Sequence, residues 1–476
     1  MELRTIFDLL PLIIISFVII LSILIEAFYK KSENLIYILS VITLIGTAIF
    51  SLVNLESQRL YFSDMIHSGG ITNLFYFILL LAASFVIISS KNYLQRLNYH
   101  HGEYYIIILN STLGMMLMSA SRDLMLTFLA LELMSLSFYV LAGFIRNVLF
   151  NNEASLKYFL LGAFATGFLL YGIALIYGST QTTNILTITT NFAQFLHKLL
   201  FILGIVLFLV GLSFKVAAVP FHMWVPDVYE GSPTTVTALM STAGKTAAFG
   251  ALIVSLYGST GYQVKVNYET ISNIIAYLAT ASMLLGSVVA IAQSSLKRML
   301  AYSSIAHAGY MLIGIAAANK FGMSGVIFYL TVYTFMNIGA FILISIMESS
   351  VEKRVTLDDY TGISSTHPWY AALMSVFMFS LAGIPPFGGF FGKYYVFLAA
   401  IRADMTWLAV VGVISSIISA YFYLRVVIYM YFKKGSTEPA IFYSYKENFV
   451  LTLCVLIVLQ LGLTPGLFLD LINKYL

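Results

Sequence analysis

Three lysines lie inside long apolar segments of this chain, where a basic side chain is costly to keep. Lys215 lies in GLSFKVAAVPFH, Lys245 in STAGKTAAFG and Lys393 in PPFGGFFGKYYVF. Each costs at least ~2.5–3.5 kcal/mol at the centre of a bilayer. Burial disfavours the charged form of a lysine and a nearby carboxylate restores it, so such a residue can hold or release a proton near neutral pH. This pattern predicts a proton relay rather than a Ca²⁺ or Na⁺ site, which needs several oxygen ligands.

Three further ionisable residues fall within apolar segments. Lys157 and Arg425 are the other basic residues there, and Glu132, in LMLTFLALELMSLSF, is the acid that remains inside. Lys157 lies in the first turns of its helix, where it either joins the relay or extends its ammonium group to the membrane surface. Arg425 stays charged under burial, so we expect it to pair with a helix end or a lipid headgroup. Glu132 either exchanges protons with a lysine or neutralises one structurally.

Two histidines and a pair of basic residues are weaker candidates for the same chemistry. His222 lies just after Pro220, where a polar group can reach water, and His307 lies inside the apolar segment AYSSIAHAGYML. Histidine titrates near neutral pH, but a histidine within a helix also serves as a hydrogen-bonded packing residue. Lys297 and Arg298 lie in a tight turn between two segments and suit plain determinants of topology. Tyrosine and phenylalanine are abundant, and we assign them only packing and interface roles.

The composition places the chain among the polytopic α-helical membrane proteins. Of its 476 residues, 60% are hydrophobic and 10% are charged, and the mean hydropathy is +0.91. A soluble domain carries about 25% charged residues, and a membrane barrel has alternating strands rather than continuous apolar runs of about 20 residues. The net charge of +4 comes without a basic cluster, which argues against nucleic acid as a partner.

Motifs for redox or nucleotide chemistry are missing from the sequence. The single cysteine, Cys454, rules out a disulfide within the chain and a four-cysteine metal or iron–sulfur site. The patterns GxGxxG, GxxxxGK[ST] and HExxH are also absent. We therefore expect no cofactor and no metal in this chain.

Fourteen apolar segments are long enough to cross a membrane. The first lacks a small-residue cleavage site and is expected to remain as a helix. The expected spans are residues 9–28, 35–53, 71–90, 104–120, 123–145, 154–178, 197–218, 235–258, 270–292, 300–317, 322–347, 369–400, 406–432 and 448–472. Proline interrupts two of them, because it lacks a backbone donor and clashes with the preceding turn. The seventh should be cut at Pro220, restart through residues 221–224 and stop at Pro226, and the twelfth should break at residues 383–389.

The two interrupted spans lie five helices apart, which divides the chain into four parts. Residues 1–100 would hold three N-terminal spans, 101–260 the first five-helix repeat, 261–434 the second and 435–476 the last span. An odd number of spans makes the second repeat inverted, as in secondary transporters with sites near the bilayer midplane. Two unrelated proline kinks are the alternative, because the halves share little sequence.

The charges of the loops predict the orientation of the chain. If the N-terminus lies outside, twelve Lys and Arg residues fall in inside loops and eight fall in outside segments. The positive-inside rule therefore places both termini on the outer side.

Three blocks of sequence resemble one family. Residues 214–252 (FKVAAVPFHMWVPDVYEGSPTTVTALMSTAGKTAAFGAL), 294–312 (SSLKRMLAYSSIAHAGYML) and 379–397 (FSLAGIPPFGGFFGKYYVF) are similar to blocks of the antiporter-like, proton-translocating membrane subunits of respiratory complex I. The form DVYEGSPTTVTAL differs from the sodium/proton antiporter subunits, which usually resemble WLPxAHxxAPxPxSALLH at this point. Thr235 departs from the proline that the family commonly has there.

The resemblance implies roles for the residues already singled out. It implies that Glu132 pairs with Lys215, that Lys245 is the central relay and that Lys393 is the other terminal proton site. It matches four more residues to secondary positions in the family, namely Lys157, His222, Lys297 and His307. It also implies that NADH, FMN, iron–sulfur clusters and quinone are handled by partner subunits, with none bound in this chain.

The resemblance further implies the surroundings of the chain. The partners would be other membrane and peripheral subunits of complex I, including other antiporter-like subunits, together with membrane lipids. The expected location is a bacterial inner membrane. Two other functions remain open at this point: a subunit of a cation/proton antiporter, and a structural spacer between neighbouring subunits. The identity of the quinone and of the electron donor is not encoded in any residue of this chain.

Overall fold

Most of the described part of this chain is helical. The structure is a computed structural model that describes residues 3–190, 198–257, 268–348, 356–434, 442 and 444–476. Its first part consists of α1 (Leu3–Phe28), α2 (Glu33–Val53), β1 (Arg59–Tyr61), β2 (Ile66–Ser68), α3 (Gly70–Arg96), α4 (Gly102–Ala120), α5 (Leu124–Ala142), α6 (Leu149–Thr180), α7 (Ile185–Thr190) and α8 (Lys198–Val216). Strands β1 and β2 form an antiparallel hairpin in which Leu60 pairs with His67.

The second part begins at the first helix break. It consists of α9 (Val225–Gly231), α10 (Thr234–Leu239), the π-helical turn η2 (Met240–Gly244), α11 (Lys245–Tyr257), α12 (Tyr268–Ile291), α13 (Leu296–Ala317), α14 (Lys320–Met347), the 3₁₀ turn η3 (Asp358–Tyr360), α15 (Ile363–Thr366), α16 (Pro368–Ala382), α17 (Gly388–Arg402), α18 (Thr406–Phe432), α19 (Tyr445–Leu463) and α20 (Pro465–Tyr475). Hydrophobic runs of this length form helices across a bilayer because a helix satisfies its own backbone groups.

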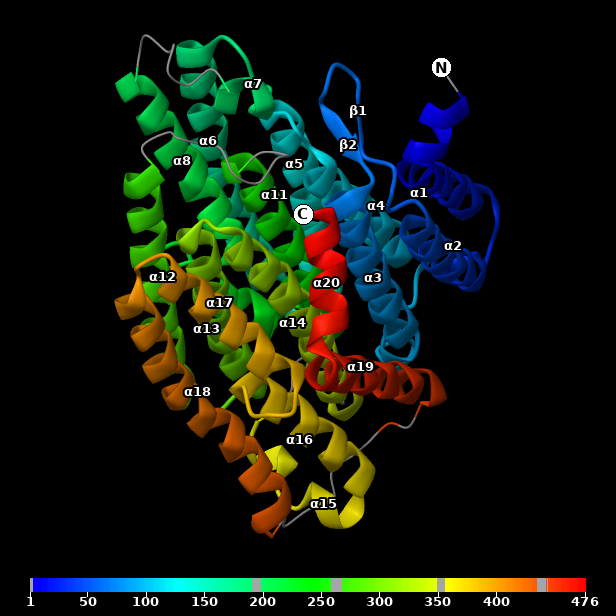
Figure 1. Cartoon of the computed structure of the whole chain (residues 1–476). Coiled ribbons are helices and arrows are strands. Elements are labelled where there is room, and N and C mark those ends of the chain that lie inside the picture. Colours follow the sequence, from blue (N-terminus) through cyan, green and yellow to red (C-terminus); the bar gives the residue numbers. More distant parts are fainter. Residues whose placement is uncertain (1–2, 191–197, 258–267, 349–355, 435–441, 443) are drawn as a thin grey trace.

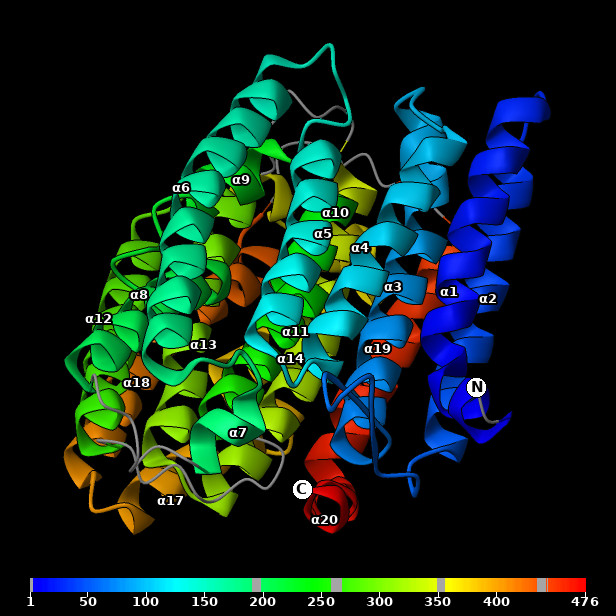
Figure 2. The same ribbon diagram turned by 90° about the horizontal axis from the view of Figure 1, so that it is seen from above.

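The expected membrane-spanning segments are present. In the described part of the chain, twelve helices are long and apolar enough to cross a membrane. The two remaining expected spans are α4, which has 19 residues, and the broken pair formed by α16 and α17. The final span, expected to be continuous over residues 448–472, is divided instead. Helix α19 ends at Leu463 and α20 begins at Pro465, because proline is accommodated in a first turn but not in a helix interior. Figures 1 and 2 show α20 turning steeply away from α19.

Helices α13 and α14 form the centre of the bundle. The apolar stretch of α14 is completely buried, and α14 packs against α3, α10, α13, α16, α17, α19 and α20. Helix α13 packs against α9, α12, α14 and α17. Helices α1 and α2 lie at one edge of the bundle and α12 and α18 at the opposite edge (Figures 1 and 2). Most polar groups on α13 are therefore buried within the bundle.

The seventh span is broken earlier than the sequence suggested. Helix α8 ends at Val216, where Ala217 adopts a left-handed backbone with φ of 67°. Residues 217–224 form turns rather than a resumed helix, and α9 then begins at Val225 with Pro226 in its first turn. The prediction that Pro226 stops a helix was wrong, because proline at this position starts one.

The twelfth span breaks where the Gly-Pro-Pro-rich segment predicted it. Helix α16 ends at Ala382, Gly383 takes a left-handed φ of 85°, and α17 begins at Gly388. Glycine suits this position because it has no Cβ to clash. The break leaves carbonyl groups at the end of α16 without helical partners, and one of them is used by a site residue.

Candidate proton-transfer site

Helix α13 carries the polar residues of the site at helical spacing. Lys297, Ser304, His307 and Tyr310 are all buried. Residues three or four apart share a face of a helix, so Ser304, His307 and Tyr310 follow one another along α13. At 1.5 Å per residue, Lys297 and Tyr310 are about 20 Å apart along the axis. One helix thus supplies polar groups over much of the thickness of the membrane.

Lys245 lies at the start of α11, directly after the π-helical turn η2. Its side chain is 2% exposed. Nζ donates to the carbonyl oxygen of Ser304 at 2.7 Å and also bonds the hydroxyl of the same residue. Single π-helical turns occur frequently at functional sites. The sequence located Lys245 correctly inside a span but gave no sign of this turn.

His307 is held by two tyrosines from different helices. Its Nδ1 bonds the Tyr329 hydroxyl of α14 at 2.8 Å, and its Nε2 bonds the Tyr423 hydroxyl of α18 at 2.9 Å. The Tyr423 hydroxyl also bonds that of Ser303. A neutral imidazole donates from one nitrogen and accepts at the other, so a proton shift across the ring reverses both hydrogen bonds. These tyrosines are part of the site, which corrects the expectation that tyrosine serves only in packing and at the interface.

Lys393 reaches back across the helix break. From α17, its Nζ donates to the carbonyl oxygen of Ala382 at 2.9 Å and to Oγ of Ser416 at 2.8 Å. Nζ also lies 4.9 Å from the ring centre of Tyr310. The end of α16 carries partial negative charge, which favours a cation there. His307 lies within electrostatic range of both Lys393 and Lys245, so the three residues form one row.

Lys215 lies in an aromatic enclosure at the end of α8. Its Nζ donates to the Tyr139 hydroxyl at 3.2 Å and lies 5.5 Å from the ring centre of Tyr158. Glu132 is close enough to act on Lys215 electrostatically, but in this structure the two side chains form no direct ion pair. Oε1 of Glu132 is buried without a hydrogen-bond partner among the described residues. The structure therefore brings Glu132 and Lys215 near each other without the pairing that the resemblance implied.

A buried ion pair lies at the start of α13. Lys297 Nζ is 3.5 Å from Oε1 of Glu348, and the two side chains are 5% and 2% exposed. Glu348 also accepts from Tyr93 at 3.1 Å and from the hydroxyl of Thr234, while Lys297 donates to the carbonyl of Ser232 at 3.0 Å. The sequence did not identify Glu348 as a buried acid, because this residue follows the last turn of α14 and lies outside the expected spans. Lys297 is equally a core residue and not only a determinant of topology.

Glu348 is not the only buried acid that the sequence placed in a loop. Asp8, Asp123 and Glu447, which lie at the ends of expected spans, are also buried. Hydropathy detects the ends of apolar runs, whereas packing of neighbouring helices covers residues just beyond those ends.

One of the expected intramembrane cations lies near the surface of the bundle. Lys157 has 41% of its side chain exposed and pairs with Glu153 at 2.6 Å and Asp227 at 2.9 Å. Asp227 also accepts from Arg298 at 2.8 Å. Burial raises the pKa of Asp227, but the hydrogen bonds from Lys157 and Arg298 outweigh it and leave that pKa below its usual value. This surface network does not touch the buried row.

The remaining candidates are Arg425 and His222. Arg425 donates from both Nη atoms, at 2.8 Å each, to the carbonyls of Ile291 and Gln293 at the end of α12, as expected for an arginine that caps a helix end. His222 is 8% exposed and lies in the turns between α8 and α9. Its Nδ1 has no hydrogen-bond partner within the described residues, and no described bond joins it to the row.

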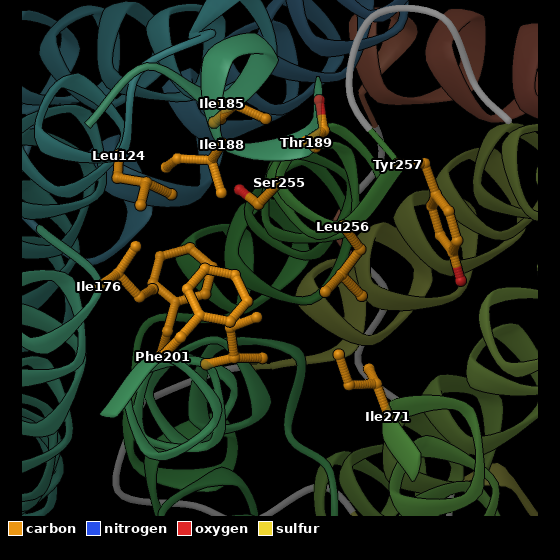
Figure 3. Close-up of a pocket in the computed structure, with 12 residues that line it drawn as sticks. Leu124, Ile176, Ile185, Ile188, Thr189, Phe201, Ser255, Leu256, Tyr257 and Ile271 are labelled. Atoms are coloured by element: carbon orange, nitrogen blue, oxygen red, sulfur yellow. The ribbon is translucent and has the colours of Figure 1, made fainter. Parts of the chain in front are cut away.

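An apolar cavity lies away from the row. It has a volume of about 50 Å³ and includes Leu124, Ile188, Phe201 and Ile271 in its lining (Figure 3). Ser255 also lines it, and its hydroxyl bonds no described group. None of its described lining residues carries a carboxylate, an amine, a guanidinium or an imidazole group.

Broken membrane helices beside a row of buried lysines and a histidine are typical of ion-translocating membrane proteins. Residues 121–419 match the family model described as NADH:quinone oxidoreductase/Mrp antiporter, TM. The chain belongs to this family.

The relatives agree with this assignment. The chain is 46% identical to NADH-quinone oxidoreductase subunit N 1 of Chloroherpeton thalassium, over 97% of this chain and 96% of that protein. It is 44% identical to NADH-quinone oxidoreductase subunit N of Trichlorobacter lovleyi, over 90% and 88%. A chain of respiratory complex I from Thermus thermophilus is 32% identical, with a TM-score of 0.84, over 97% and 98%. A chain of the Mrp complex from Dietzia sp. has a TM-score of 0.87 over 99% and 97%, but at 20% identity it shows the shared fold alone.

Proposed function

We infer that this chain is a proton-translocating membrane subunit of an NADH–quinone oxidoreductase. The observation that carries the inference is the buried row Lys245, His307 and Lys393, built on α11, α13 and the broken pair α16 and α17, in a chain that matches subunit N relatives along nearly its whole length. The redox steps, from NADH through FMN and iron–sulfur clusters to quinone, belong to partner subunits in this proposal. This chain contributes proton movement only.

The central step runs along α13. Lys245 Nζ gives a proton toward Oγ of Ser304, its hydrogen-bond partner. Ser303 is the next residue on the helix, and its hydroxyl bonds Tyr423, which bonds His307 Nε2. His307 passes a proton across its ring from one tyrosine to the other, because its two nitrogens are the two ends of one acid–base group. Neutral Lys393 accepts the proton at the far end, and the carbonyl end of α16 stabilises the cation that forms.

The first half of the chain holds the control element. Lys215 is surrounded by aromatic rings, and Glu132 lies near it without a direct bond. A carboxylate that approaches a buried lysine favours its charged form, and withdrawal releases the proton. We propose that a signal from the redox subunits moves Glu132 relative to Lys215 and thereby drives protons from Lys215 toward Lys245. Lys157 and His222 would act at entry, since both lie at the side of the bundle where α9 begins.

The proposal extends to the surroundings of the chain. It places the protein in a bacterial inner membrane as one of several subunits, with both termini on the outer side. The two five-helix units, residues 101–260 and 261–434, would be inverted repeats, each with one broken helix. Other antiporter-like subunits and membrane lipids would cover the exposed apolar faces of α1, α6 and α18.

Purification through a C-terminal tag in mild detergent tests the function. Co-purification of quinone-reductase subunits bearing flavin and iron–sulfur centres, with NADH-dependent quinone reduction, is the expected result. Sodium-dependent proton flux in vesicles that lack any quinone reductase would overturn the proposal in favour of an antiporter. Neutralising Glu132, Lys215 and Lys393 together separates pumping from a spacer role, because a spacer would lose assembly but keep its activity per assembled complex.

A further inference from the structure

Arg122 is a buried cation outside the proton row. It lies in the turn between α4 and α5 and is 3% exposed. Nη1 donates to the carbonyls of Ser119 at 3.3 Å and Ser121 at 3.0 Å. Nη2 makes only a long contact of 3.5 Å to the hydroxyl of Thr72, and Nε has no partner among the described residues. No carboxylate of the described chain pairs with Arg122, although buried guanidinium groups are ordinarily paired.

The bonds that Arg122 does make leave the buried Nε–Nη2 edge of its guanidinium group without a strong partner among the described residues. The carbonyls at the end of α4 take Nη1 and offset part of the charge. Nε and Nη2 lie on the other edge, where the donors are parallel. Two parallel donors on one edge bind the two oxygens of a carboxylate or a phosphate. The free edge therefore has the geometry of an oxyanion site.

Arg122 lines a cavity of about 170 Å³. This volume is far above the ~15 Å³ that a single water needs. The polar wall is formed by Arg122, by Gln58 and His67 of the hairpin segment, and by Lys474 of α20. The opposite wall is apolar and includes Ile253, two turns along α11 from Lys245. In Figure 2 the N-terminal end of the chain and α20 lie at the same end of the bundle, so the cavity is far from the surface where α9 begins.

Arg122, Lys474 and the terminal residue Leu476 bring the charged groups of the cavity lining. Burial lowers the pKa of Arg122 to about 10, so its side chain stays protonated at neutral pH. Burial and the neighbouring Arg122 lower the pKa of His67 to about 3, so this residue is neutral. His67 Nδ1 bonds the Thr72 hydroxyl at 2.8 Å, which fixes the ring beside the arginine. Lys474 is 61% exposed and contacts Glu56 at 3.3 Å, a pair that solvent screens.

We propose that this cavity binds a phosphate-class oxyanion, which occupies the free Nε–Nη2 edge of Arg122. The ligand chemistry is common to two sources, the headgroup of an anionic phospholipid and free inorganic phosphate. The apolar wall fits the acyl side of a lipid headgroup, and the polar wall fits either source. The site shares no residue with the proton row, so it is independent of the proposed function.

Binding is tested on the purified complex in two arms. One arm measures binding of radiolabelled inorganic phosphate by equilibrium dialysis, with chloride at equal ionic strength as the reference. The other measures retention of phosphatidylglycerol against phosphatidylcholine after reconstitution in mixed vesicles and extraction. In whichever arm the wild type binds its ligand, Arg122→Gln should weaken binding by at least ~tenfold, because the substitution removes a charge-assisted bidentate contact. Lys198→Gln, at an exposed lysine, is the control and should bind as wild type.

Each result decides the proposal. Loss of phosphatidylglycerol retention alone identifies a lipid headgroup, and loss of phosphate binding alone identifies a soluble oxyanion. Equal binding by wild type and Arg122→Gln in both arms would overturn the proposal. If Arg122→Gln fails to assemble, the same binding measurements are made on Lys474→Ala, since Lys474 is exposed and lines the same cavity. Binding by Lys474→Ala equal to that of Lys198→Gln would then refute the site, and weaker binding would support it.

Discussion

Replacing Glu348 by glutamine should strongly destabilise this protein. Glu348 Oε1 lies 3.5 Å from Lys297 Nζ, and the two side chains are 2% and 5% exposed. At an effective dielectric constant of about 20, unit charges at this distance attract by about 5 kcal/mol. Glu348→Gln leaves the Lys297 ammonium buried without its counter-ion, and such losses cost ~3–5 kcal/mol. We expect the free energy of unfolding to fall by that amount.

Denaturant unfolding of the purified subunit in mixed micelles measures this loss. The double variant Glu348→Gln/Lys297→Met should recover about half of it or more, because no uncompensated charge remains. Glu56→Gln is the matched control. Its partner Lys474 lies 3.3 Å away, but the two side chains are 83% and 61% exposed, so the expected loss is ~0–1 kcal/mol. A loss for Glu348→Gln no larger than that of Glu56→Gln would refute the reasoning.

Three other predictions concern the site and the β1–β2 hairpin. Tyr423→Phe removes the hydroxyl that bridges serine and histidine, so proton translocation in vesicles should fall by about tenfold or more. The control Tyr105→Phe removes a buried hydroxyl with no described partner and should leave proton translocation unchanged. Burial lowers the pKa of His67 from 6.5 to about 3, so the unfolded chain takes up the proton first as the pH falls. The free energy of unfolding should therefore drop by about 2–3 kcal/mol between pH 6.5 and 4.5. Denaturant titrations at several pH values measure this drop, and an equal drop in a His67→Gln variant would contradict its assignment to His67. Gly383→Ala places a methyl group at a φ of 85° and 3.2 Å from Lys393 Nζ. It should cost ~1–3 kcal/mol and reduce translocation, whereas unchanged thermal stability would argue against strain at this break.

The sequence predicted those features that local chemistry determines. Hydropathy located the spans because a bilayer demands about 20 apolar residues in a row. Lys215, Lys245 and Lys393 were evident because charge within such a run is rare. Proline and glycine predicted the breaks of the seventh and twelfth spans, although the exact ends differed, as at Pro226, which begins α9. The break before Pro465 was missed.

Features created by packing of distant segments were beyond the sequence. The pair of Lys297 and Glu348 joins residues 51 positions apart near the ends of two helices. The hydroxyls of Tyr329 and Tyr423 meet His307 from two further helices. Nothing in the sequence distinguishes these two tyrosines from the other 30, because their role depends on the contacts they make. The π-helical turn before Lys245 likewise has no recognisable sequence signal.

The role of Lys245 in proton movement is the central claim. The most direct measurement is the number of protons translocated per electron in vesicles that contain the assembled complex, compared between wild type, Lys245→Ala and Lys198→Ala. Lys198 is exposed at the start of α8, so its variant should pump as wild type. The account predicts that Lys245→Ala assembles and loses proton translocation through this subunit. Pumping by assembled Lys245→Ala complexes equal to that of wild type would contradict it.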